Sequence, residues 1–271
     1  MKDRLISAGV GIILCLALLF FGEMNPLVIQ IAISLVTGLT CGELLTAKGL
    51  HEDLKISGPC MLFGILMPLL CTTVFKFLPL YIFMLLMFIF MVVFHDKLKA
   101  NDVVFAYGGS LLITLSMTSL VLTVCSDSGF TAFYVVLTLA VPWLSDSGAF
   151  FAGITLGKHK LCPVISPKKT VEGAVGGLVS GFLGAFLIAY VFSFIYKGAT
   201  FDYIAIAIIG LLNPVISIFG DLTFSVIKRS CGVKDYGSIM PGHGGMLDRF
   251  DSIIFCAPLV FIVTQFFTII S

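Results

Sequence analysis

A carboxylate, a hydroxyl and two cations recur at helical spacing in the segment SIFGDLTFSVIKR. Asp221, Ser225 and Lys228 stand at positions i, i+4 and i+7, which places them along one face of a helix. Arg229 flanks the same face. An acid inside an apolar segment is energetically costly and by default marks a binding site or an ion path. The spacing therefore favours a site that handles charge.

Further carboxylates occur in GGMLDRFDS, where Asp248 and Asp251 stand at i and i+3, and in WLSDSGAFF, which carries Asp146. Two like charges on one helix face repel each other, and a nearby cation would stabilise them. Carboxylate oxygens suit Mg²⁺, which proteins commonly hold through one or two carboxylates while phosphate oxygens and water complete the coordination. The nearby Lys and Arg residues suit the remaining phosphate charge. The pattern indicates phosphate chemistry assisted by Mg²⁺.

Glycines surround a histidine just before these acids, in the string PGHGG. Gly242, Gly244 and Gly245 beside His243 allow the backbone to approach a ligand closely. They lead into the predicted start of the last helix, where free N–H groups favour an anion.

A second basic segment, KHKLCPVISPKKTVEG, repeats this theme. Ser166 and Pro167 predict the start of a helix, with Lys168 and Lys169 in its first turn. Cations at that position oppose the helix dipole. An anionic ligand that approaches the same end explains their placement better.

Composition places these charged segments in a membrane protein. The 271 residues are 59% hydrophobic and 11% charged, and the mean hydropathy is +1.12, so the charges are too few to cover a soluble globule. The formal net charge of +1 gives no reason to expect nucleic acid as a partner. Eight scattered cysteines without a C-x-x-C pair are typical of membrane helices rather than of metal sites or disulfides.

A membrane-spanning helix needs about 20 apolar residues. This length criterion predicts an all-α polytopic membrane protein with nine transmembrane helices. The first apolar run lacks a clear cleavage site and is interpreted as a retained span rather than a signal peptide. Between the third and fourth predicted spans only Lys76 and Pro79 interrupt the apolar sequence. The alternative there is that these two segments form one re-entrant pair of helices. The predicted spans are residues 5–22, 26–46, 56–75, 77–94, 103–124, 130–157, 171–196, 203–227 and 250–270.

The distribution of cations predicts the orientation, because short cytoplasmic loops carry the excess of Lys and Arg. With the N-terminus cytoplasmic and the C-terminus on the outer side, only Lys76 and Lys197 of the 16 Lys and Arg residues lie outside. Residues 1–100 are interpreted as membrane helices that form a scaffold and a candidate dimer contact. Residues 101–271 are interpreted as a catalytic membrane domain with a site on the cytoplasmic side.

The segment SVIKRSCGVKDYGSIMPGHGGMLDRFDS, residues 225–252, resembles the signature of the phosphatidate cytidylyltransferases, the CDP-diacylglycerol synthases. Their pattern is S-x-x-K-R-x4-K-D-x-G-x3-P-G-H-G-G-x-x-D-R-x-D. WLSDSGAFFAG and the following GKHKLCPVISPKKTVEG resemble the family's second block, and the specific resemblance covers roughly residues 142–260. The fixed positions of the signature are all matched, by Ser225, Lys228, Arg229, Lys234, Asp235, Gly237, Pro241, Gly242, His243, Gly244, Gly245, Asp248, Arg249 and Asp251.

The resemblance implies a reaction of CTP with phosphatidic acid that gives CDP-diacylglycerol and pyrophosphate, with Mg²⁺ as cofactor and room for a second cation. It implies that Asp221 and Asp248 hold the metal, and the paired Asp251 joins them as a candidate ligand. Candidate cations for the pyrophosphate and the lipid phosphate are Lys228, Arg229, Lys234 and Arg249. The other candidate substrate-binding residues are Asp146, Lys168, Lys169, Ser225, Asp235, Gly244 and Gly245.

No general base is strictly required, because a phosphate monoester has a second pKa of about 6 and is already largely ionised near neutral pH. His243 is therefore interpreted as a hydrogen-bond donor to a phosphate, within a catalytic set that also contains Asp221, Asp248, Lys228, Arg229 and Arg249. The expected partners are CTP, phosphatidic acid and the lipid bilayer, and a homodimer is a family-level expectation. With no organelle-targeting segment evident, the predicted location is a bacterial cytoplasmic membrane, with a multi-pass topology.

Two rival functions stay open. A membrane-bound kinase that uses CTP would transfer the γ-phosphoryl group to a lipid alcohol, although the complete H-G-G-x-x-D-R-x-D string argues against it. A secondary transporter would also keep acids inside the membrane, but it would typically show repeated halves or broken helices at mid-membrane. Here the charged residues cluster at one face.

Overall fold

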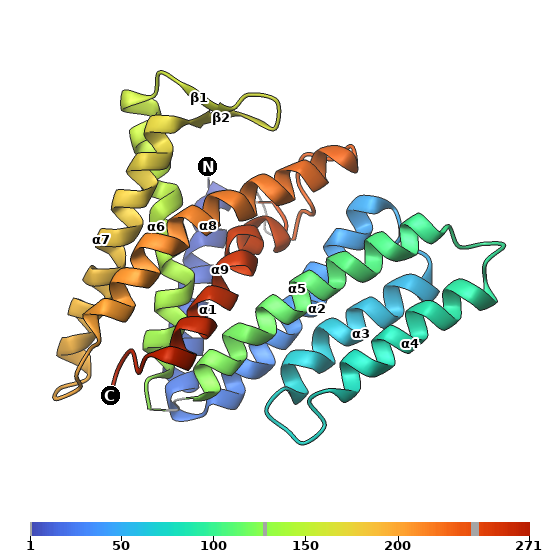
Figure 1. Cartoon of the computed structure of the whole chain (residues 1–271), viewed down its shortest axis with the longest axis horizontal. Coiled ribbons are helices and arrows are strands. Elements are labelled where there is room, and N and C mark those ends of the chain that lie inside the picture. Colours follow the sequence, from blue (N-terminus) through green and yellow to red (C-terminus); the bar gives the residue numbers. More distant parts are fainter. Residues whose placement is uncertain (1, 127–128, 240–243) are drawn as a thin grey trace.

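The computed structural model describes residues 2–126, 129–239 and 244–271, with the backbone alone for residues 2–10 and 12. Within these ranges the chain forms nine helices and one two-stranded hairpin (Figure 1). The helices are α1 (Lys2–Met24), α2 (Pro26–Lys48), α3 (Leu54–Leu70), α4 (Leu78–Val93), α5 (Ala100–Ser126), α6 (Thr131–Leu156), α7 (Val171–Ile195), α8 (Tyr203–Ser230) and α9 (Leu247–Phe266). The strands are β1 (Lys160–Cys162) and β2 (Ser166–Thr170).

Several of these helices have the dimensions of a membrane span, and each of the nine predicted segments overlaps one of the helices. By length and composition, α2, α5, α6, α7 and α8 could cross a membrane. The helices α3 and α4 are also apolar but shorter, with 17 and 16 residues. The prediction of a helical protein with several helices of membrane-spanning length is confirmed, while the count of nine spans and the orientation stay predictions.

The ends of α2 show how local sequence sets these helices. Asn25 caps the N-terminus, where its side-chain oxygen accepts the N–H of Leu27 at 3.0 Å, and Pro26 follows at the first helical position. Gly49 ends the helix at a φ of +76°, a left-handed conformation that glycine adopts without strain. Between these caps α2 packs against α3 and α5 and reaches the start of α9.

The helices α6 and α7 pack closely against each other and form one side of the candidate active site (Figure 1). A Cβ added at Gly177 would lie 3.0 Å from the carbonyl oxygen of Ser145, and one added at Gly173 would lie 2.8 Å from that of Ala149. Only glycine permits this approach of the two backbones, as is common between membrane helices. The contact fixes the C-terminal half of α6 beside the hairpin that leads into α7.

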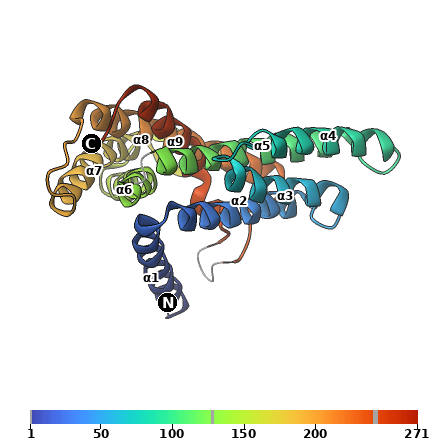
Figure 2. The ribbon, with the colours of Figure 1, turned by 90° about the horizontal axis from the view of Figure 1, so that it is seen from below.

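The first helix leaves the layer formed by the others, as Figure 2 shows. Glu23, at the end of α1, attaches it to the rest of the protein. Its Oε1 accepts the hydroxyl of Tyr196 at 2.7 Å, and its Oε2 accepts the N–H of Ala132 at 2.8 Å. The carboxylate thereby joins α1 to the end of α7 and the start of α6.

The segment before α7 differs from the prediction. Ser166 and Pro167 do not start a helix, and Lys168 and Lys169 do not lie in a first turn, because residues Ser166–Thr170 form β2, which pairs with β1 in antiparallel fashion. The helix begins only at Val171, where the hydroxyl of the N-cap Thr170 accepts the N–H of Gly173 at 3.1 Å. The two lysines are therefore presented by a strand.

The base of this hairpin is closed by Glu172 in the first turn of α7. Its carboxylate accepts the N–H of Lys158 at 3.0 Å and approaches Nδ1 of His159 at 2.6 Å. An acid in the first turn also suits the helix dipole. Glu172 therefore fixes the hairpin to the helix that follows it.

Candidate active site

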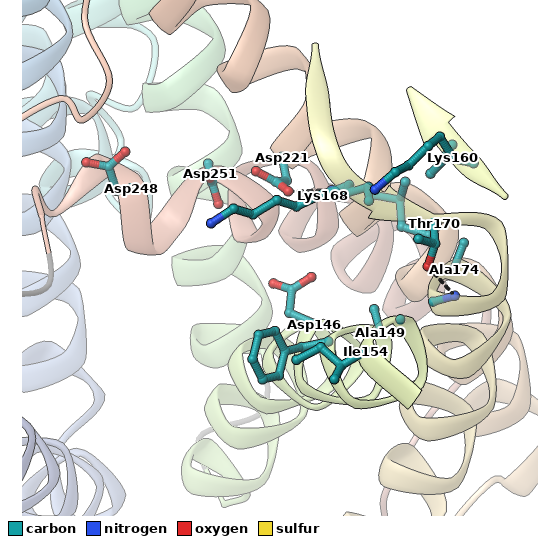
Figure 3. A pocket seen from close by; sticks show the side chains of 16 residues that line it. Asp146, Ala149, Ile154, Lys160, Lys168, Thr170, Ala174, Asp221, Asp248 and Asp251 are labelled. Atoms are coloured by element: carbon teal, nitrogen blue, oxygen red, sulfur yellow. Dashed lines mark hydrogen bonds and ion pairs between the residues drawn. The ribbon is translucent and has the colours of Figure 1, made fainter. Parts of the chain in front are cut away.

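A cavity of about 660 Å³ lies between the hairpin, the C-terminal halves of α6 and α8, and the first turns of α7 and α9. Figure 3 shows that charged side chains from these elements face it. A volume of this order suits a small-molecule site. The charged lining residues are Asp146, Lys160, Lys168, Lys169, Asp221, Asp248 and Asp251. The apolar ones include Phe150, Ile154, Leu161 and Ile218.

Three carboxylates approach one another in the cavity from three different helices. Asp146 of α6 points toward Asp221 of α8 and Asp251 of α9 (Figure 3), and their charges interact unfavourably. The hydroxyl of Ser217 donates to Oδ1 of Asp146 at 3.5 Å, and the N–H of Ser252 donates to Oδ1 of Asp251 at 2.7 Å. Asp251 is only 8% exposed. Like charges gathered at this depth favour the arrival of a cation.

Lysines of the hairpin face these carboxylates. Lys169 forms an ion pair with Asp221, whose Oδ1 also accepts the hydroxyl of Ser225 at 3.4 Å. Lys168 extends across the cavity toward the carboxylates, and Lys160 reaches it from β1 (Figure 3). Lys168 and Lys169 are among the predicted substrate-binding residues. Lys160 is not, because the pairing of Lys160 with Thr170 across the hairpin has no signal in the sequence.

Asp248 has a different environment from the other three acids. Its Oδ1 accepts the Lys228 ammonium at 2.8 Å, and its Oδ2 accepts the backbone N–H groups of Tyr236 at 2.9 Å and Gly245 at 3.0 Å. The two charged side chains are 7% and 13% exposed. Asp248 thus holds the loop between α8 and α9 closed at both of its ends.

Tyr236 anchors the same loop to α8. Its hydroxyl donates to the carbonyl of Phe224 at 2.9 Å, and its ring lies 5.3 Å from the Lys228 ammonium. Burial raises the pKa of Tyr236 well above its usual value. The hydroxyl therefore stays protonated and keeps its hydrogen bond.

The remaining predicted residues that the structure describes lie around the loop and do not line the cavity. Arg229, Lys234, Asp235 and Arg249 are exposed. Gly244 has a φ of +88°, a left-handed conformation that favours glycine. His243, together with Pro241 and Gly242, lies outside the described residues. The roles assigned to all of these residues stay predictions.

The donor set fits a divalent cation that arrives with phosphate. Among the described residues, no three His, Cys, Asp or Glu side chains form a ready-made metal cluster. Mg²⁺ is usually held through one or two carboxylates together with substrate phosphates and water, and Asp146, Asp221 and Asp251 offer such oxygens at the cavity. Both oxygens of Asp248 already accept protein donors. Its environment favours a positioning role, and its role as a metal ligand stays a prediction.

Comparisons with known proteins identify the family of this chain. The family model for the cytidylyltransferase family matches residues 2–267. A phosphatidate cytidylyltransferase of Staphylococcus saprophyticus is 43% identical over 131 residues, which make up 47% of this chain and 47% of the relative. One of Bacillus subtilis is 40% identical over 135 residues, or 50% of this chain and 48% of the relative.

A third relative, the phosphatidate cytidylyltransferase of Staphylococcus haemolyticus, is 43% identical over 131 residues, which again make up 47% of each chain. The matched region spans about half the length of the curated relatives. The family predicted from the signature is confirmed, since the family model extends over nearly the whole sequence. This chain belongs to the cytidylyltransferase family.

Proposed function

We propose that this protein is a phosphatidate cytidylyltransferase, which transfers the cytidylyl group of CTP to phosphatidic acid and releases pyrophosphate. One observation carries the proposal: a cavity in which acidic residues from three helices face lysines of a hairpin, between the C-terminal halves of α6 and α8, two apolar helices of membrane-spanning length. The family membership and the names of the relatives support it.

The cavity suits two anionic substrates that must be brought together. Lys160 and Lys168 present ammonium groups that would bind phosphate oxygens. Asp146, Asp221 and Asp251 would repel the same phosphates unless a cation lies between. One or two of these carboxylates would hold Mg²⁺ together with phosphate oxygens, and the ion when bound supplies positive charge to those oxygens.

In the proposed reaction an oxygen of the lipid phosphate forms a bond to the α-phosphorus of CTP, and the bond from that phosphorus to the bridging oxygen of the pyrophosphate breaks. The attacking phosphate is already ionised, so no side chain needs to remove a proton. The chain's own contribution is to hold both substrates in line and to stabilise the charge that develops on the leaving pyrophosphate. The hairpin lysines, which line the cavity, would perform the second task.

The apolar part of the cavity supports a lipid as one substrate. Phe150 and Ile154 of α6 line it and are 62% and 67% exposed. Exposed side chains of this kind on a membrane helix face the acyl chains of the bilayer. We infer that the lipid enters beside α6, with its phosphate in the cavity and its acyl chains along the helix.

Nine spans, a cytoplasmic N-terminus and a cytoplasmic site belong to the same proposal, because they place the basic hairpin and the loop after α8 on the side where CTP is available. An alkaline phosphatase fused to the C-terminus would then be active in a bacterial cell. An inactive fusion that is stably inserted would contradict this orientation. The homodimer stays a prediction.

The test of the reaction uses purified protein in detergent with Mg²⁺, phosphatidic acid and CTP labelled at either the α- or the γ-phosphate. Label in the lipid from α-labelled CTP alone, with release of pyrophosphate, is the expected result. Transfer of the γ-label to a lipid alcohol would instead indicate the kinase. Flux of a substrate across sealed vesicles without either transfer would indicate the transporter.

A further inference from the structure

A buried acid from the N-terminal part of the chain contacts the start of α9. Glu43 lies in α2 and is 6% exposed. Its Oε1 accepts the N–H of Met246 at 2.9 Å, and its Oε2 accepts the N–H of Leu247 at 2.7 Å. Some 203 positions separate Glu43 from Met246 along the chain. Both oxygens are therefore used to satisfy backbone donors.

The start of α9 needs such a partner. The first N–H groups of a helix have no acceptor within the helix, and the residue at the N-cap position, Met246, has no side chain that accepts a hydrogen bond from them. A carboxylate from another helix takes this place and interacts favourably with the positive end of the helix dipole. Glu43 thus supplies from α2 the cap that the local sequence of α9 lacks.

The loop between α8 and α9 closes tightly around the same carboxylate. A Cβ added at Gly237 would lie 2.5 Å from Oε1 of Glu43, and one added at Gly245 would lie 2.6 Å from Oε2. Such distances are too short for any real contact, so only glycine fits at these two positions while Glu43 keeps its place. The two glycines of the signature are explained here by the carboxylate rather than by an unusual backbone conformation.

The contact is connected to the site through α9. Asp248 lies in the same first turn and holds the N–H groups of Tyr236 and Gly245, while Asp251 follows one turn later and faces the cavity. A shift of the first turn of α9 would move both acids. A displacement of about 1 Å in a catalytic group can reduce a rate about 100-fold.

We infer that Glu43 is a positioning residue, which caps α9 from α2 and sets the place of the α8–α9 loop and of Asp251 relative to the cavity. The part of this inference that concerns turnover rests on the proposed function. Both oxygens must accept for the cap to form. A glutamine offers one accepting oxygen and would present an NH₂ group to the other N–H.

The test compares Glu43→Gln with Glu23→Gln. The second change is a matched control, because Glu23 also accepts a backbone N–H and a second donor but lies at α1, away from the cavity. Hydrogen exchange of peptides that cover residues 244–250 reports on the cap, and kcat and KM report on the site.

The inference predicts that Glu43→Gln accelerates amide exchange at the start of α9 and lowers kcat about ten-fold or more, with a smaller change in the KM for CTP. Glu23→Gln leaves both quantities near the wild-type values. Equal behaviour of the two variants would overturn the inference. So would a Glu43→Gln protein that loses thermal stability but keeps kcat and exchange unchanged per folded molecule.

If Glu43→Gln does not fold, Gly237→Ala tests the same contact, because it displaces the carboxylate without removing it. Faster exchange at the start of α9 supports the inference, and unchanged exchange contradicts it. A folded wild-type protein that makes no CDP-diacylglycerol contradicts the proposed function. The exchange measurement still decides the role of Glu43 in that case.

Discussion

The Asp248 carboxylate and the Lys228 ammonium form an ion pair of 2.8 Å between the last turns of α8 and the first turn of α9. Both side chains are largely removed from solvent. The second oxygen of Asp248 holds two backbone N–H groups of the intervening loop. The charged signature segment is therefore in part a structural clamp, and its acids do not all have the same task.

Replacing Asp248 with asparagine should destabilise the protein as well as impair turnover. The variant loses a charge-assisted hydrogen bond and leaves the Lys228 ammonium without its counter-charge, which costs about 1.5–3 kcal/mol. Thermal unfolding in detergent would show a lowered Tm. Asp96→Asn, at an exposed position, is the control and should leave the Tm unchanged. A Tm for Asp248→Asn equal to that of the control would contradict the clamp.

Replacing Asp251 with asparagine should have the opposite effect on stability. Asp251 is buried beside Asp146 and Asp221, and neutralising one of three mutually repelling charges relieves that repulsion. The Tm should stay the same or rise, as is common where a site trades stability for function. A fall in Tm as large as that of Asp248→Asn would show that Asp251 is a structural residue instead.

Replacing Lys160 with alanine should weaken substrate binding, although this lysine was not selected from the sequence. Its ammonium lines the cavity, whereas Lys158, two residues earlier, does not. Loss of a charged hydrogen bond to a phosphate is worth about 1.5–3 kcal/mol, which corresponds to about a ten-fold to 100-fold increase in KM for the substrate that it binds. Steady-state kinetics would show less than a two-fold change for Lys158→Ala. Equal effects of the two changes would contradict the assignment.

Replacing Gly237 with alanine should be harmful only while Glu43 is present. The added methyl group would overlap the Glu43 carboxylate. The three atoms nearest to this methyl group all belong to Glu43. In a Glu43→Ala background these nearest atoms are removed, so the second change should add little, and a double-mutant cycle should show a coupling of about 1–3 kcal/mol. Gly58→Ala, where an added Cβ meets no atom within 4 Å, is the control. Additive effects would contradict the close contact.

Periodicity and motif spacing predicted much of this protein because they report local structure. Asp221 and Ser225 were expected on one helix face, and in α8 the hydroxyl of Ser225 donates to Asp221. The helical segments were found from apolar length alone, since a membrane span must satisfy its own backbone hydrogen bonds. The signature gave the family because its residues are close together in the sequence.

Contacts between distant segments could not be predicted in the same way. The hairpin was missed because Ser166 and Pro167 are equally good at a helix start and in an extended strand, and only the pairing with β1 decides between them. Glu43 is an acid inside the predicted span 26–46, but its partners could not be predicted because they are more than 200 positions away. The different roles of Asp248 and Asp251 likewise depend on which of the two forms the ion pair with Lys228.

The most direct test of the account is the transfer of α-labelled CTP to phosphatidic acid by the wild-type protein, Asp221→Asn and Asp251→Asn, all purified in the same detergent with Mg²⁺. The account predicts labelled CDP-diacylglycerol from the wild type and a loss of about 100-fold or more in both variants, while both remain folded. Folded variants that keep wild-type rates would contradict the assignment of the reaction to the carboxylates of this cavity.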